Sequence, residues 1–184
     1  MEEILKVIFD CGGVIYGEYV RDQIAGDDSD SIDVIIEKID ILVKLLTEYE
    51  YTPINETNHI FVSKHPDLLP LKVIIVEKKR EYEYLIPPIE LDFNVNSLAI
   101  TGDELYNWAC LSHCDDLFVP NVIECIKNRT MLKNKNINND LSKLLDRGYK
   151  LIGEFDCQHE EYDTDDAYED YLYRAAREPK SEWF

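Results

Sequence analysis

The chain has 184 residues, of which 45% are hydrophobic, so it is long enough to bury one proper core. Its 38 acidic residues outnumber 19 basic ones and give a formal net charge of −19. Proteins that bind long nucleic acids neutralise phosphates with Lys and Arg, so this balance argues against such a substrate. No apolar run reaches the length of a membrane span, and the acidic start is unlike a secretory signal.

The first third of the chain predicts short helices alternating with short strands. Helices are expected at 2–9, 18–25 and 38–50, and strands at 14–16 and 31–36. Gly17 can adopt the positive φ of a sharp turn into a helix, and Gly26 is a natural helix stop. Ser31 and Asp33 fall on one face of their strand, because strand side chains alternate.

The rest of the chain predicts a sheet followed by helices. Strands are expected at 59–63, 71–77, 82–86, 89–100, 105–109 and 149–153, and helices at 121–128 and 139–147. Residues 97–101 and 105–109 flank Gly102-Asp103, which predicts a hairpin. Residues 71–77 are apolar almost throughout, which places them inside the sheet. Residues 89–100 alternate strictly between polar and apolar, which is typical of a strand with one wet face. The predicted fold class is α/β (α+β), with a mixed sheet, flanking helices and a helical C-terminal part.

Residues 14–33 form the most distinctive stretch, V-I-Y-G-E-Y-V-R-D-Q-I-A-G-D-D-S-D-S-I-D. A helix N-terminus beside a glycine turn favours phosphate, because free N–H groups and the helix dipole attract anions. The stretch resembles the nucleotidyltransferase superfamily that includes DNA polymerase beta, most closely its tRNA CCA-adding and poly(A) polymerase branch. Seven residues match the family pattern: Gly17, Val20, Arg21, Asp22, Ile24, Gly26 and Asp33.

The resemblance implies a divalent-metal site that moves a nucleoside monophosphate from an NTP to a hydroxyl. The implied nucleotide-binding positions are Gly17, Glu18, Arg21 and Asp22. Asp33 is the implied metal ligand on the second strand, and Asp92, ahead of Glu90, is the candidate for a further carboxylate from a later strand. Both Asp33 and Asp92 would be catalytic. Residues 87–98 are also loosely similar to nucleotidyltransferase-like proteins of large DNA viruses.

Two positions depart from the family pattern. Glu18 replaces the second glycine, and Ser31 stands at the position of the first metal-binding Asp. Glu18 brings negative charge where phosphate would approach, and a neutral serine hydroxyl is a weak ligand for Mg²⁺. Asp30 is one residue away from Ser31 and would point to the opposite face of the strand. The metal site is therefore predicted to be degenerate and its Mg²⁺ binding weak.

The leading prediction for function is a nucleotidyltransferase-fold protein that acts by binding a nucleotide or a protein rather than by catalysis. One alternative is an active nucleotidyltransferase in which Asp30 or Glu18 fills the gap beside Asp33 and Asp92. Another is an acidic interaction protein that mimics nucleic acid and occupies a basic partner.

The predicted organisation is a domain at 1–153, with a core at 14–110 and a helical extension at 119–153, and an acidic aromatic tail at 154–184. Between residues 154 and 170 the tail has nine acids and no Lys or Arg, so it docks on a protein partner or stays solvated. Five irregularly spaced cysteines indicate free thiols in an intracellular, cytoplasmic setting, the host cytoplasm if the protein is viral. A zinc site is an alternative to scattered thiols and imidazoles, using Cys110, His113, Cys114, Cys157 and His159.

Overall fold

The computed structural model describes residues 1–54, 60–76, 90–102, 104–109, 115–137, 140–156 and 178–179. The predicted strand at 82–86 and the whole Cys/His set lie outside these residues, as does most of the acidic tail. Within the described part, no helix is long and apolar enough to cross a membrane.

The N-terminal elements form as predicted. They are α1 (Glu2–Asp10), β1 (Val14–Tyr16), α2 (Glu18–Ala25), β2 (Ile32–Ile36) and α3 (Ile39–Glu48). Gly17 precedes α2 at φ 70° and ψ −129°, and Gly26 ends it in the left-handed region at φ 72°. Both conformations favour glycine, so the chain can turn sharply at each end of α2.

The main sheet is mixed, so the fold is α/β as predicted. Its further strands are β3 (Tyr51–Pro53), β4 (Ile60–Ser63), β5 (Leu71–Ile75), β6 (Leu98–Ile100), β7 (Glu104–Asn107) and β10 (Glu178–Pro179). Among the described residues the strand order is β10-β7-β6-β1-β2-β5-β4-β3, and β2 and β5 pair in parallel while the other neighbours are antiparallel. The apolar β5 is an interior strand, as predicted, and β6 and β7 form the expected hairpin.

Two hydrophobic clusters lie on opposite faces of this sheet. The larger one packs the helices against alternate strand residues such as Ile15, Val34 and Val73. The smaller one includes Tyr16, Ile35 and other residues that point the other way. Because side chains alternate along a strand, Asp33 and Tyr16 share the face of the smaller cluster.

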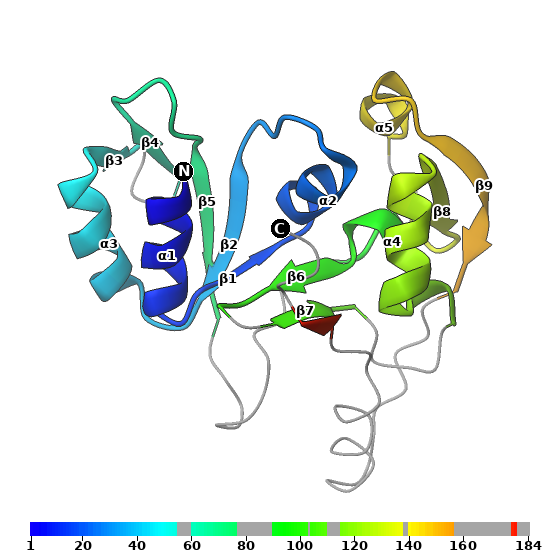
Figure 1. Ribbon diagram of the computed structural model, residues 1–184, viewed down its shortest axis with the longest axis horizontal. Helices are drawn as coiled ribbons and strands as arrows, with labels where there is room; N and C mark the ends of the chain where they lie inside the picture. Colours follow the sequence, from blue (N-terminus) through cyan, green and yellow to red (C-terminus); the bar gives the residue numbers. More distant parts are fainter. Residues whose placement is uncertain are drawn as a thin grey trace, which may run out of the picture.

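The C-terminal part contains more strand than predicted. It consists of α4 (Val119–Lys127), β8 (Thr130–Asn134), α5 (Ser142–Asp146) and β9 (Lys150–Phe155), and β8 and β9 pair in parallel as a separate two-stranded sheet. Figure 1 shows this unit at one end of the molecule, with α1 and α3 side by side at the other. α2 packs on α4, which brings the C-terminal unit next to the Gly17 turn.

Candidate functional site

A pocket of about 310 Å³ opens at the Gly17 turn, and we call it the Gly17 pocket. Its lining residues come from four separate segments: Tyr16, Gly17, Glu18, Asp33, Glu90, Leu91, Asp92, Asn96 and Trp108. Four of the residues predicted for the site, namely Gly17, Glu18, Asp33 and Asp92, therefore meet in one cavity. Ligand pockets of small molecules begin at about 300 Å³, so the Gly17 pocket is large enough for one.

The end of β1 and the start of α2 build one wall. The Gly17 N–H donates to the Leu98 carbonyl at 2.9 Å, which ties the turn to β6. Glu18 follows as the first residue of α2 and points its carboxylate to the pocket rim. There its Oε2 accepts a hydrogen bond from Lys143 Nζ of α5 at 2.5 Å.

Asp33 lies on β2, and its side chain is 17% exposed. Burial raises the pKa of this carboxyl, Glu18 raises it further, and the nearby Lys72 lowers it. Lys72 Nζ lies 3.7 Å from Asp33 Oδ1, and the two residues are register partners on the parallel strands β5 and β2. The carboxylate predicted to hold a metal ion thus already has a cation beside it.

Asp92 lines the pocket but does not lie on a strand. Its Oδ1 accepts hydrogen bonds from the Phe93 N–H at 2.8 Å and from Asn96 Nδ2 at 3.1 Å. The backbone carbonyl of Asn96 accepts a hydrogen bond from Trp108 Nε1 at 3.0 Å. These bonds orient Asp92, the Asn96 amide and the Trp108 ring toward the same cavity.

The predicted strand at 89–100 is wrong for most of its length. Residues 94–96 form a 3₁₀ turn, and within the described residues 90–100 the strand is limited to Leu98–Ile100. Asn94 is buried and its Oδ1 accepts from the Leu132 N–H of β8, while the Asn134 N–H donates to the Asp92 carbonyl. The Asn94 side chain and the Asp92 backbone carbonyl thus bond to β8, and the Asp92 carboxylate accepts from the adjacent Phe93 N–H, a local bond that competes with a regular strand.

Ser31 and Asp30 do not line the pocket. Ser31 is buried just before β2 begins. The Asp30 side chain is 73% exposed and faces Arg147 and Lys143, with its Oδ2 3.3 Å from Arg147 Nη2. Asp30 therefore does not supply the carboxylate that Ser31 lacks.

Arg21 and Asp22 are buried inside the protein rather than in the pocket wall. Arg21 Nε and Nη2 donate to Asp22 Oδ1 at 2.8 and 2.6 Å, and Nη1 donates to Asn96 Oδ1 at 2.8 Å. Burial raises the pKa of Asp22, and the charges of Arg21 and Arg147 oppose that rise. Arg21 thus reaches the pocket through two lining residues, the Asn96 amide that it orients and Glu18, whose Oε1 lies 3.9 Å from Arg21 Nη1.

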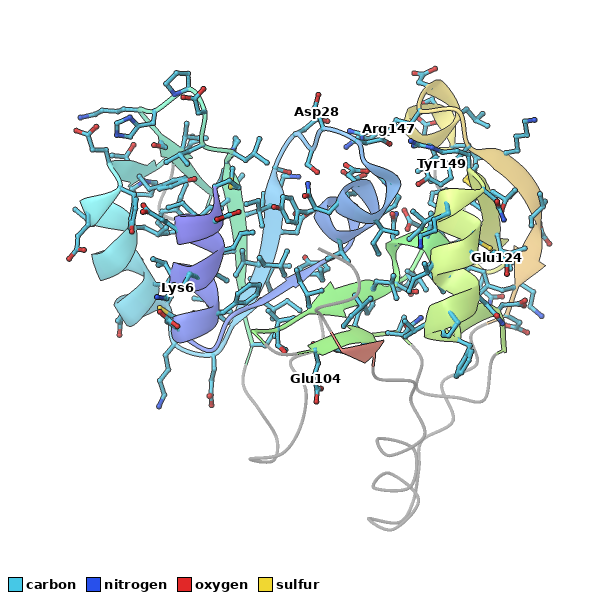
Figure 2. All side chains as sticks on the ribbon, in the orientation of Figure 1. Lys6, Asp28, Glu104, Glu124, Arg147 and Tyr149 are labelled. Atoms are coloured by element: carbon cyan, nitrogen blue, oxygen red, sulfur yellow. The ribbon has the colours of Figure 1, made fainter. Side chains whose placement is uncertain are left out.

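A network of charges joins α2 to the C-terminal unit. Arg147 Nη1 lies 2.8 Å from Asp22 Oδ2, and Arg129 is paired with Asp27. Tyr149 sits between the guanidinium groups of Arg21 and Arg129, at 5.8 and 5.3 Å from its ring centroid. Figure 2 shows Arg147 and Tyr149 next to each other beside α5. These contacts hold α5, and with it Lys143, over the pocket rim.

The donor set does not fit a divalent ion well. Mg²⁺ takes six hard oxygen ligands in near-octahedral geometry, usually one or two carboxylates together with waters and substrate phosphates. Asp33 is paired with Lys72, and one oxygen of Asp92 already accepts two hydrogen bonds. Within the described part of the chain, no three His, Cys, Asp or Glu side chains are grouped as metal ligands.

Several residues of the pocket were missed by sequence reasoning. Tyr16 and Trp108 stack edge to face with their ring centroids 6.2 Å apart and form an aromatic side of the pocket. Lys72 and Lys143 were also missed, because each reaches the pocket acids from a distant segment. The one available signal was the position of Lys72, a charged residue near the start of a strand that is otherwise apolar.

The comparisons with known proteins add little. No family model and no curated protein matches the chain. Among solved structures, a tRNA-processing enzyme (apo form I) is similar at 16% identity with a TM-score of 0.45. The match covers 71% of this chain and 34% of that one, so this chain corresponds to about a third of its length. A likeness this low supports no functional conclusion.

Proposed function

We propose that this chain is a nucleotidyltransferase-fold protein that binds a nucleotide weakly in the Gly17 pocket and does not transfer it. The observation that carries the proposal is the meeting of Gly17, Asp33 and Asp92 in one cavity, although they come from distant parts of the sequence. The motif at 14–33 relates Gly17 and Asp33 to a nucleotide site, and Asp92 is the candidate for the further carboxylate that the same resemblance implies. Trp108 supplies an aromatic surface, and the Asn96 amide supplies hydrogen-bonding groups, both of which suit a nucleoside.

The absence of transfer is argued from the ligand set. Nucleotidyl transfer needs carboxylates that are free to clamp metal ions around the triphosphate. In this pocket Asp33 is paired with Lys72, and Glu18 adds a negative charge at the rim. Any Mg²⁺ bound here is expected to be held weakly.

Calorimetric titration with ATP, with and without Mg²⁺, tests the binding step. We expect a dissociation constant of about 1 mM. Fluorescence of Trp108 gives a second readout if Trp183, the other of the two tryptophans, is replaced by Phe. Unchanged heat and fluorescence up to about 10 mM ATP would refute the nucleotide site.

Transfer of radiolabel from NTP to an acceptor tests the claim of inactivity, and detectable transfer by the wild type would overturn it. The variant Glu18→Gly should bind Mg–ATP about tenfold more tightly, because it removes a negative charge from the pocket lining where the triphosphate would approach. Glu2→Gly is the matched control, since Glu2 is the first residue of α1 as Glu18 is of α2.

Neither rival function is favoured by a specific observation. An active enzyme would need Asp30 or Glu18 as a ligand, but Asp30 faces solvent and Arg147, and Glu18 is paired with Lys143. The acidic mimic rests on net charge and would require salt-sensitive capture of a basic, DNA-binding protein. The protein partner of the tail, the cytoplasmic location and the viral origin stay predictions.

A further inference from the structure

Two lysines reach the acids of the Gly17 pocket from opposite sides. Lys72 lies on β5, one strand away from β2, and Lys143 lies on α5 of the C-terminal unit. Each contacts a different lining carboxylate, Asp33 and Glu18 respectively. Two separate segments of the fold thus direct ammonium groups to neighbouring pocket acids.

The position of Lys72 follows from the strand register. Asp33 is the register partner of Tyr16 on β1 and of Lys72 on β5, so all three side chains project from the same face of the sheet. That is the face on which Tyr16 and Asp33 line the pocket. The backbone pairing therefore places Lys72 beside Asp33 on this face of the sheet.

Both lysines are about half exposed, at 49% and 48%. Burial does not lock such long side chains, so the carboxylates themselves hold the ammonium groups in place. The charge of Lys143 also acts on Asp33, whose pKa it lowers together with Lys72. The two lysines and the two acids are therefore one electrostatic cluster at the pocket mouth.

We propose that Lys72 and Lys143 are the resident cations of the Gly17 pocket and exclude a divalent metal ion from Asp33 and Glu18. This inference rests on the proposed function, because it concerns the same pocket. A divalent ion bound to Asp33 must either displace the Lys72 ammonium group or lie within a few ångströms of it, where the two positive charges repel each other. The pocket therefore works without the metal that the sequence motif implies, and Lys72 is the residue that determines this.

Titration with Mn²⁺ alone, followed by calorimetry and by its electron paramagnetic resonance signal, tests the inference without any nucleotide. The wild type should bind Mn²⁺ weakly. Lys72→Met should bind it on the order of tenfold more tightly, since one adjacent positive charge is lost. Lys143→Met should give a smaller gain in Mn²⁺ affinity. Arg21 still places a positive charge near Glu18 in this variant, and Asp30 already offsets part of the Lys143 charge in the wild type.

Lys6→Met is the matched control, because it changes the net charge equally. Lys6 lies on α1, which packs against the other face of the sheet, and Figure 2 shows it far from α5. Its Mn²⁺ affinity should stay within about twofold of wild type, as expected for a screened distant charge. Lys72→Arg should also behave as wild type, since it keeps the cation.

Equal Mn²⁺ affinities of Lys72→Met and Lys6→Met would overturn the inference, as would tight binding by the wild type. Adding Asp33→Asn to Lys72→Met should abolish the gain in Mn²⁺ affinity. A gain that persists in this double variant would also contradict the inference. Thermal unfolding of each variant confirms that it folds. Failure of ATP binding would refute the proposed function and leave these metal titrations unaffected, so the two failures can be told apart.

Discussion

Replacement of Arg21 by Met separates a structural role of this arginine from the nucleotide-binding role that its motif position implies. The guanidinium is fully buried, donates two hydrogen bonds to Asp22 and one to Asn96, and packs on Tyr149. Methionine fills much of the same volume but leaves the Asp22 carboxylate without its main partner. The expected consequence is a loss of stability before any loss of binding.

The size of the loss can be worked from these contacts. Removing one partner of a buried ion pair costs about 3–5 kcal/mol, because the other charge is left buried. Arg147 still lies 2.8 Å from Asp22 Oδ2 in the variant, so we expect the lower end, about 3 kcal/mol. With a urea m value of about 2 kcal/mol per molar, the unfolding midpoint should fall by roughly 1.5 M.

Urea unfolding followed by circular dichroism measures this shift. Asp22→Asn removes the stranded charge, so the Arg21→Met/Asp22→Asn double variant should lose less stability than the sum of the two single changes. A destabilisation below about 1 kcal/mol for Arg21→Met would refute the reasoning, since it would approach the roughly 0.5 kcal/mol typical of surface substitutions. Normal stability together with lost ATP binding would instead assign Arg21 to the ligand.

Three further predictions concern the turn, the hairpin and Asp33. Gly17→Ala should cost about 1–3 kcal/mol in urea unfolding, because Gly17 has φ 70° and ψ −129°, a conformation open mainly to glycine; an unchanged midpoint would contradict this. Asn107→Ala should cost about 3 kcal/mol, because the side chain donates to Ser97 Oγ and the Leu117 carbonyl and accepts from a backbone N–H; a loss under 1 kcal/mol would count against it. Burial raises the Asp33 pKa above 3.8. Between pH 3.8 and the raised pKa the folded state therefore binds more protons than the unfolded state. The free energy of unfolding should fall as pH rises through that window. Asp33→Asn should lack this dependence and melt at a higher temperature at pH 7, and an equal or lower melting temperature would refute the assignment.

Local chemistry was enough to predict the signature segment. The β1–α2–β2 unit depends on a β-prone run, on Gly17 and Gly26 at positive φ, and on apolar spacing within eight residues. Each of these is visible within a short window. The hairpin of β6 and β7 and the apolar interior strand β5 were predictable for the same reason.

The segment 89–100 shows where prediction from the local polar and apolar pattern fails. Its alternation is typical of a strand, but Asn94 and Asp92 bond to β8, which lies about 40 residues further along the chain. The pattern records only which residues are polar, and the partner of each polar group is set by packing. Asp92 nevertheless lines the Gly17 pocket, from the segment just before the 3₁₀ turn at 94–96 instead of from a strand.

The amino-acid order alone thus specified a glycine turn, a short helix and an acidic strand, because these depend on backbone preferences of neighbouring residues. The three-dimensional packing decided which charges meet. It brought Asn96 to Arg21 and Arg147 to Asp22, and it brought Lys72 and Lys143 to the pocket acids. Charge pairing depends on distances between segments that are remote in sequence, so a window of adjacent residues carries no information about it.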